Sequence, residues 1–439
     1  MSGVSTRACA AGFAFSKKFA TARIFPVRAA RAGVQRPFHR FFRLWSGNTA
    51  SGIATWALPF VLGFAVADAV LSPVDLGIFL ALRSAGFLVA VPVAGVMADR
   101  VGSRWIILVS SLIAACGAAL IFLDIAGDTR PLSILTAAGV VLSGMGQGAC
   151  RPVYQSIVPG LVPEAELQIA NAALSFSVRA TILIGPAAAT LVATAFGLEA
   201  AFLVIGLLWM ISAVLPPWPA EPDREIRRAI AGTGLAGRFA ADLLEGYHEA
   251  RRHPWFFAAL AALSAVVATG YSVTGVLVPL ISTTIYNNAS LLAGSVTAYM
   301  SGALLGGVAI SYWKPVKRGW WALAGLGAYS VVPLSLLVPE IFWIPMAAYV
   351  IAGFGMELFN VIWFTAIQGE IERRKLSRVS SLDFIVSYGL APLGLSAIAP
   401  LSQGLGMTAV LVATAIVCVV AACLAAAVPT APEFRMKRI

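Results

Sequence analysis

Long apolar stretches alternate with short polar ones along most of the chain. Runs of about 20 apolar residues recur from residue 46 onward, each long enough to cross a hydrocarbon core of about 30 Å as a helix. They lie near 46–67, 76–98, 105–124, 132–156, 168–195 and 199–216, and then near 255–280, 290–312, 320–338, 341–367, 379–402 and 405–428. We therefore predict an all-α integral membrane protein with about twelve transmembrane helices.

A longer polar stretch separates the two sets of six runs. The segment Pro216-Pro217-Trp218-Pro219 ends the sixth run, because consecutive prolines cannot continue a helix. We predict two six-helix bundles joined by a linker, in five parts: a basic tail at 1–43, a bundle at 44–217, a linker at 218–254, a bundle at 255–428 and a tail at 429–439.

The linker carries a helical pattern of its own. Apolar residues at helical spacing lie opposite charged ones, with Phe239, Leu243, Leu244 and Tyr247 on one face and Arg238, Glu245 and Glu249 on the other. The pattern predicts an amphipathic helix on the membrane surface that links the bundles mechanically.

The charges are few and are distributed unevenly between the predicted loops. Charged residues make up only 12% of the chain, and nine of the 31 Lys and Arg residues precede the first apolar run. The even-numbered loops are basic, whereas the other side has Arg130 as its single cation, so we expect both termini to be cytoplasmic. The net charge of +11 then indicates contact with anionic membrane lipids and does not argue for nucleic-acid binding. The Ala-rich, Lys-poor composition favours a bacterial inner membrane.

The first 40 residues are rich in Arg and Ala and contain no acid. This composition overlaps that of organellar targeting segments. A basic tail and a start-site error are the alternatives, and we favour the tail.

Cysteine and histidine usage argues against metal and redox chemistry. The five cysteines contain no CxxC pair, and the histidines, His39, His248 and His253, all fall in segments predicted to be cytoplasmic. We also find no phosphate-binding loop and no nucleophile–base arrangement. We expect no metal, no cofactor and no enzymatic activity.

The loop between the second and third runs has an unusual charge pattern. Its sequence from Gly95 to Arg104 is GVMADRVGSR, which places Asp99 beside Arg100 and before Gly102 at a membrane exit. The pattern G-x-x-x-D-R-x-G-x-R resembles a loop signature of the major facilitator superfamily of transporters, although Ser103 replaces a basic residue that is usual there. The resemblance implies a conformational gate in which Asp99 contacts the N-terminal end of the eleventh helix near Ser380 and Ser381.

Two acids and several arginines fall at membrane depth, where each charge costs about 3 kcal/mol or more unless it is paired or hydrated. Glu357 lies near the middle of the tenth run, and Asp383 about one turn into the eleventh. A structural hydrogen bond is the alternative for Glu357, and pairing with Arg378 or another inner-surface cation is the alternative for Asp383. Snorkelling or structural pairing competes with substrate binding for the arginines Arg83, Arg151 and Arg179.

Prolines recur at corresponding places in the two halves. Ser175 precedes Gly185-Pro186 in the fifth run, and Ser381 precedes Ala391-Pro392 in the eleventh at the same separation. A proline within a helix removes one backbone hydrogen bond, so we expect bends at Gly185, Pro186 and Pro392.

The resemblance extends over nearly the whole chain, from Phe41 to about Leu424. It is carried by the motifs LWSGN at 44–48, ANA at 170–172, ELFN at 357–360, IWFTAIQ at 362–368 and LSRVSSxD at 376–383. These motifs are similar to those of a bacterial efflux branch that includes enterobactin-type siderophore exporters and macrolide-efflux proteins. Two features depart from it: Ala54-Thr55 stands where many relatives have an acid, and Arg151 does not align with the family's fourth-helix arginine.

The resemblance implies alternating access around a central cavity, driven by protons. Glu357 is the first candidate for proton coupling and Asp383 the second. The substrate-cavity candidates are Asn48, Trp56, Gln147, Arg151, Arg179, Tyr271 and Asn360, with lipid anchoring or core packing as alternatives for Trp56 and Tyr271. The expected partners are a small amphipathic substrate, protons and lipids around a monomer. Import by the same fold, or a non-transporting enzyme or receptor, is the alternative function.

Overall fold

The protein is described here from a computed structural model. The described residues are 35–68, 70–127, 134–218, 244–287, 290–372 and 375–435. The chain divides into two units, Met1–His39 and Arg40–Ile439, and all contacts below lie within the second. The side chains of Asp99, Arg100 and Pro392, the tail at 1–34 and the linker at 219–243 lie outside the described residues.

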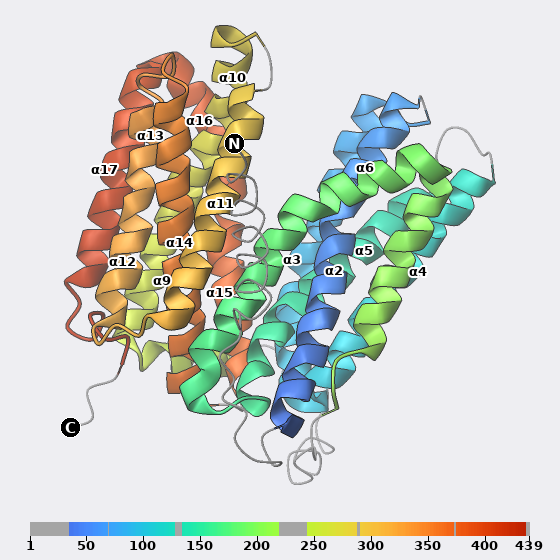
Figure 1. Cartoon of the computed structure of the whole chain (residues 1–439), viewed down its shortest axis with the longest axis horizontal. Coiled ribbons are helices and arrows are strands. Elements are labelled where there is room, and N and C mark those ends of the chain that lie inside the picture. Colours follow the sequence, from blue (N-terminus) through green and yellow to red (C-terminus); the bar gives the residue numbers. More distant parts are fainter. Residues whose placement is uncertain are drawn as a thin grey trace, which may run out of the picture. The chain divides into compact units, whose positions relative to one another are not determined.

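The first bundle has six spans in five helices (Figure 1). Its helices are α2 (Gln35–Ala67), α3 (Pro73–Val101), α4 (Ser103–Ala126), α5 (Ile134–Ser156) and α6 (Leu167–Val214), with the short turns η1 (Val158–Gly160) and η2 (Glu164–Glu166) before α6. The last helix contains both the fifth and the sixth span. The two meet at Gly197, whose φ of 88° lies in the left-handed region that favours glycine.

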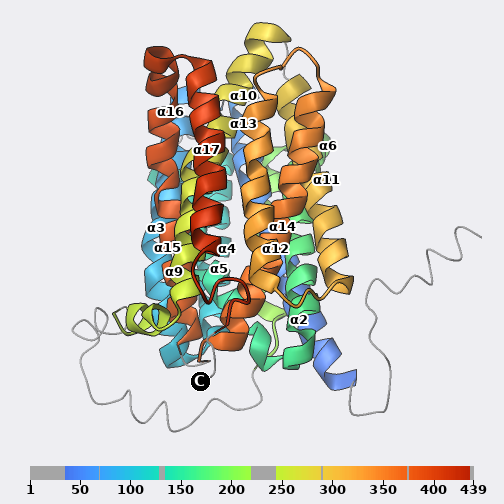
Figure 2. The same cartoon turned by 90° about the vertical axis from the view of Figure 1, so that its left-hand side faces the viewer.

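The second bundle also has six spans, three of them interrupted. The seventh span is α9 (Pro254–Val266), η3 (Val267–Tyr271) and α10 (Ser272–Ile285); the eighth is α11 (Ser290–Tyr312); the ninth is α12 (Arg318–Gly327), η4 (Ala328–Ser330) and α13 (Val331–Ser335); the tenth is α14 (Trp343–Glu370); the eleventh is α15 (Leu376–Gly389) and α16 (Ala391–Leu405); the twelfth is α17 (Met407–Ala426). The twelfth span, α17, packs on α9 and α12 (Figure 2).

The prediction of an all-α membrane protein is confirmed. Eight helices of the described chain are long and apolar enough to cross a membrane, and the 51-residue one contains two spans. The remaining spans are the fourth (α5), the ninth and the eleventh. No strand occurs in the part of the chain that the structure describes.

Glycines bring two pairs of helices into backbone contact, one pair in each bundle. A methyl group on Gly144 or Gly148 of α5 would overlap the backbone of α3, and one on Gly302 or Gly353 would overlap the facing backbone of α14 or α11. Small residues permit such close packing of transmembrane helices. Because these are the second and fourth spans of each bundle, the packing repeats between the halves.

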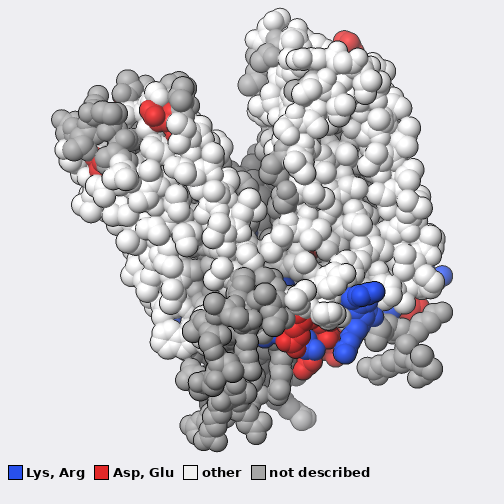
Figure 3. All heavy atoms as spheres, turned by 180° about the vertical axis from the view of Figure 1, so that it is seen from behind, with Lys and Arg blue, Asp and Glu red and all other residues white. Residues whose placement is uncertain are grey.

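Charged side chains mark the two ends of the bundles differently. We call the end with Arg104, Lys314, Lys375, Arg378 and Arg435 the basic side, and the opposite end, with Asp68, Asp75, Glu199 and Glu340, the acidic side. Figure 3 shows Lys and Arg atoms, with Asp and Glu atoms beside them, gathered at one end of the visible face, with a broad uncharged band above them.

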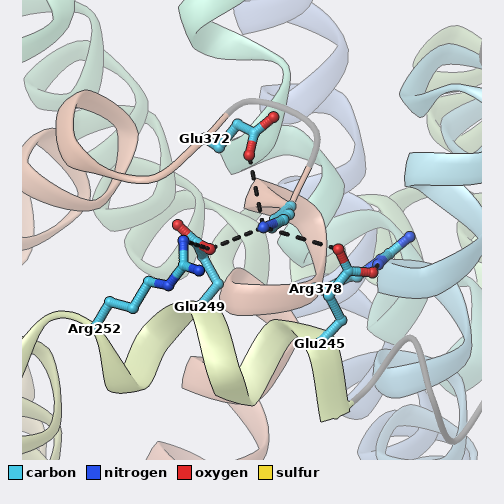
Figure 4. A network of polar contacts seen from close by, with 6 residues as sticks. Glu245, Glu249, Arg252, Glu372 and Arg378 are labelled. Atoms are coloured by element: carbon cyan, nitrogen blue, oxygen red, sulfur yellow. Dashed lines mark hydrogen bonds and ion pairs between the residues drawn. The ribbon is translucent and has the colours of Figure 1, made fainter.

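The linker ends in a helix at 244–251 that is bound to the second bundle on the basic side (Figure 4). Glu249 is buried and accepts a hydrogen bond from Lys375 Nζ at 2.9 Å, and Glu245 pairs with Arg378. The hydrogen bond to Glu249 is the main cause that raises the pKa of Lys375 above its usual value. Leu244 and Tyr247 are exposed, as predicted for an apolar face, while the acidic face binds protein.

Candidate functional site

A buried ion pair joins the two bundles halfway along their helices. Arg179 Nε of α6 donates to Glu357 Oε2 of α14 at 2.9 Å. The Glu357 side chain is fully buried and that of Arg179 is 14% exposed. Arg179, predicted to line the substrate cavity, and Glu357, predicted to couple protons, thus form one ion pair. Among the described residues, Glu357 Oε1 has no hydrogen-bond partner.

Glycines on α11 make room for this carboxylate. A methyl group on Gly306 would lie 3.0 Å from Glu357 Cβ, and one on Gly307 would lie 3.7 Å from Glu357 Oε1. Larger residues there would push α14 away from α11. The pair therefore depends on the close packing of the eighth and tenth spans.

A tyrosine cluster lies beside the ion pair in the second bundle. Tyr271 hydrogen-bonds to Tyr299 and stacks on Tyr329 with the ring centroids 5.0 Å apart. Thr274 Oγ1 lies 3.0 Å from the hydroxyls of both Tyr329 and Tyr349. Tyr271 and Tyr299 are close enough to Arg179 to act on its charge. Of these residues, only Tyr271 was predicted.

Asp383 lies inside the second bundle, apart from this pair. Its Oδ1 accepts hydrogen bonds from Trp363 Nε1 and Ser387 Oγ, both at 3.2 Å. The alternative that paired Asp383 with Arg378 is wrong, because Arg378 turns to Glu245 of the linker helix. Trp363 itself packs among Phe256, Phe359 and other aromatic rings, so Asp383 is held by a rigid neighbour.

Side-chain amides join the bundles on the basic side of the ion pair. Asn171 of α6 donates to Thr365 Oγ1 at 3.0 Å and to Gln368 Oε1 at 2.8 Å in α14. Gln168 donates to the carbonyls of Ile310 and Trp313. The motifs at 170–172 and 362–368 both carry the family resemblance, but the contact between them was not predicted. An amide in an otherwise apolar helix was the available signal.

The second and eleventh spans are also in contact on this side. Ser381 Oγ donates to the carbonyl of Val91 at 3.1 Å, and a methyl group on Gly95 would lie only 2.7 Å from Ser381 Cβ. Ser377 Oγ lies 2.9 Å from Ser156 Oγ. Gly95, one residue of the predicted gate, thus packs against the eleventh span. The contact predicted for Asp99, and the side chain of Arg100, lie outside the described residues.

The other two gate candidates serve the geometry of the first bundle. Gly102 joins α3 to α4 with a φ of 98°. Arg104 is buried, donates to the carbonyl of Ala213 at 2.6 Å and lies over the ring of Trp218. Its described contacts bind the end of α6, where a cation also suits the helix dipole.

The remaining cavity candidates are divided between the bundles. Gln147 accepts a hydrogen bond from Arg83, and Arg151 lies one turn further along α5. Asn48 is buried in α2, whereas Trp56 and Asn360 are partly exposed. The candidates therefore do not all converge on one point.

The predicted bends lie in two helical environments. Gly185 and Pro186 lie within the continuous helix α6, whose non-helical backbone is at Gly197, and the bend at Gly185 and Pro186 stays a prediction. The eleventh span does break, at Leu390 between α15 and α16, directly before Ala391-Pro392. A proline at the start of α16 costs no helical hydrogen bond.

The described residues contain no group of three or more His, Cys, Asp or Glu side chains that could hold a metal ion.

Comparisons with known proteins agree with this architecture. The sequence profile of the Major Facilitator Superfamily matches residues 44–395. Macrolide efflux protein A of Streptococcus pyogenes is 23% identical over 88% of this chain and 95% of its own length. A bacterial homologue of the iron transporter ferroportin, solved in an outward-facing state, has a TM-score of 0.65 at 17% identity, covering 88% of this chain and 98% of that one. The human organic anion transporter MFSD10 has a TM-score of 0.63 at 14% identity, covering 89% and 99%.

The profile covers most of the chain, including the loop signature from Gly95 to Arg104 and the helices that carry Arg179 and Glu357. The expected likeness to macrolide-efflux proteins is confirmed. Twelve helical spans in two similarly packed bundles, with polar groups between them at membrane depth, suit the movement of a solute across a bilayer. The chain is a multi-pass membrane transporter that belongs to the major facilitator superfamily.

Proposed function

We propose that the protein is a proton-coupled exporter of a small amphipathic compound, working by alternating access in a bacterial inner membrane. In this proposal the basic side is cytoplasmic, because the short loops there carry the lysines and arginines. Both termini are then cytoplasmic, and the protein works as a monomer among anionic lipids. The observation that carries the proposal is the Arg179–Glu357 pair between the bundles.

The pair connects the conformation of the bundles to the charge of one carboxylate. Opening the basic side separates α6 from α14 and so breaks the 2.9 Å contact. Separating a buried ion pair is costly while both partners remain charged. A proton on Glu357 removes the attraction, so the bundles part on the basic side once the proton has bound.

The resulting cycle is that of an antiporter. A proton from the acidic side neutralises Glu357, the transporter opens to the cytoplasm, and the proton leaves there. Substrate then binds, and the return movement restores the contact with Arg179. Asp383 is the second candidate for the proton site, because it is the other buried acid among the described residues of the membrane-spanning second bundle.

Export is favoured over import by the likeness to macrolide efflux protein A. Siderophores, macrolides and other drug-like metabolites are the candidate substrates. A knockout strain tested for intracellular accumulation of such compounds identifies both the substrate and the direction. Lower accumulation in the knockout than in the parent would indicate uptake.

Glu357→Gln in proteoliposomes tests the coupling. The amide resembles the protonated acid, so the variant is expected to exchange substrate down its gradient and to lose accumulation driven by a proton gradient. Glu340→Gln, at an exposed acid on the acidic side, is the matched control. Uphill transport by Glu357→Gln at the wild-type rate would show that Glu357 is not the proton site.

A further inference from the structure

Arg83 lies within the first bundle at membrane depth and is held there by its neighbours. It is the eleventh of the 29 residues of α3, about 15 Å from the start of that helix at 1.5 Å per residue. Its Nη2 donates to Gln147 Oε1 at 2.6 Å and to the carbonyl of Thr55 at 3.0 Å. The side chain therefore reaches from the second span to the fourth and the first.

The sequence explains why both acceptors are available. The carbonyl of Thr55 would normally bond to the N–H four residues later, but that residue is Pro59, which has none. Gly144, one turn before Gln147, packs on the backbone of Arg83 itself and so brings α5 close to α3. Pro59 thus leaves the Thr55 carbonyl free to accept from the guanidinium, and Gly144 brings Gln147 within its reach.

These contacts use two of the five N–H donors of Arg83. Among the described residues, its Nε is buried without a partner, its Nη1 makes no hydrogen bond, and no carboxylate lies within ion-pair distance. Arg151 lies close enough to act unfavourably on its charge. Even a partly buried cation is costly in a membrane protein when it has no counter-charge.

Two other arginines are compensated in different ways. Arg179 is neutralised by Glu357. Arg104 donates to carbonyls at the end of α6 and lies over the face of Trp218, although its Nε and Nη1 are also buried without a partner among the described residues. Arg83 donates only to one carbonyl and one amide oxygen, so an anion would supply the compensation that it lacks.

We propose that the transported compound carries an anionic group, of the carboxylate class, that binds the free donors of Arg83. This proposal rests on the proposed transport function and specifies its substrate. Trp56 follows Thr55 on α2, is partly exposed, and supplies an apolar surface for the rest of the compound. Basic compounds are disfavoured by the positive charge of Arg83.

Matched probes test the charge preference even while the natural substrate is unidentified. Purified protein in lipid nanodiscs is titrated with an isosteric triplet, 2-naphthoate, 2-naphthamide and 2-naphthylmethylammonium, and with the corresponding benzyl and tetradecyl series. Binding is measured from the rise in apparent melting temperature with probe concentration. At least one acid is expected to bind about tenfold or more tightly than its amide, as suits a charge-assisted hydrogen bond.

Variants assign the preference to Arg83. Arg83→Gln is expected to reduce the acid-to-amide ratio to about one, and Arg83→Lys to retain part of it because the charge remains. Arg252→Gln removes one exposed positive charge and is expected to leave the ratio unchanged. If Arg83→Gln fails to give monodisperse protein, Gln147→Leu, which removes one acceptor and leaves the cation, is expected to strengthen acid binding.

Two results would overturn the proposal: acids in every series binding no better than their amides, or the full preference surviving in Arg83→Gln. The proposed proton coupling has a separate readout. Acid binding without pumping would contradict the coupling alone, whereas proton-driven export of neutral or basic compounds without acid preference would contradict the anion site alone.

Discussion

The Arg179–Glu357 pair is expected to hold the basic side closed, and Glu357→Gln isolates that effect. The substitution keeps the size of the side chain and removes its charge. It leaves the guanidinium of Arg179, only 14% exposed, facing a neutral amide. Removing one partner of a buried ion pair costs about 3–5 kcal/mol.

That cost falls mainly on the closed state, because the pair can form only while α6 and α14 meet. At about 1.4 kcal/mol per factor of ten, the lower bound of 3 kcal/mol raises the ratio of open to closed protein about 100-fold. If this ratio is measured without substrate, its change reports only the equilibrium between the open and the closed arrangement of the bundles.

A cysteine in place of Ser377 reports this equilibrium. Ser377 is 2% exposed and its Oγ lies 2.9 Å from Ser156 of the other bundle, so a membrane-impermeant maleimide reaches position 377 only after the bundles part. The native cysteines are first replaced by alanine. Labelling of Ser377→Cys is then timed with and without Glu357→Gln, and with Glu340→Gln as an exposed acid of equal charge.

Labelling is expected to be about 100-fold faster in Glu357→Gln and unchanged in Glu340→Gln. A rate within about twofold of the parent, at equal melting temperature, would show that the pair does not hold the basic side closed.

Three further predictions concern the gate, the second acid and the topology. Gly95→Ala places a methyl group against Ser381 and is expected to speed labelling at position 377 about tenfold. Gly63→Ala, which has no neighbour within 4 Å, is expected to leave the labelling rate unchanged. Equal labelling rates in the two variants would refute the close approach of Gly95 to Ser381. Asp383→Asn keeps an oxygen that can accept hydrogen bonds from Trp363 and Ser387. The rate of uphill transport is therefore expected to stay within about threefold of wild type. A loss of transport as complete as in Glu357→Gln would indicate that Asp383 is the proton site. Reporter fusions at positions 130, 199 and 340 are expected to be external and those at 103, 235, 317 and 374 cytoplasmic; an external signal at 235 would contradict the topology.

The spans could be predicted because membrane crossing imposes a length of apolar sequence on each helix. Interruptions were harder to predict. The break before Pro392 has a sequence signal, since proline cannot continue a helix. The π-helical segment of five residues at η3 has no proline to mark it in the sequence.

The candidate site could be predicted only in part. Charges at Arg179 and Glu357 stand out in apolar helices, but their pairing joins residues 178 positions apart and follows from packing alone. The partners of Tyr271 were missed because tyrosine is also common at membrane interfaces and in cores. The sequence indicates Arg83 as a charge at membrane depth. Which of its donors stay unpaired follows only from the positions of Thr55 and Gln147 in the fold.

The linker helix at 244–251 has a consequence for dividing the protein into two polypeptides. Because Glu245 and Glu249 bind Arg378 and Lys375, this helix is structurally part of the second bundle. A break between residues 218 and 244 would keep the described contacts of this helix within the second fragment, so co-expressed halves are expected to assemble. A break at His253 would instead leave Glu245 and Glu249 on a different fragment from Arg378 and Lys375, and the natural joint of the transporter therefore lies before residue 244.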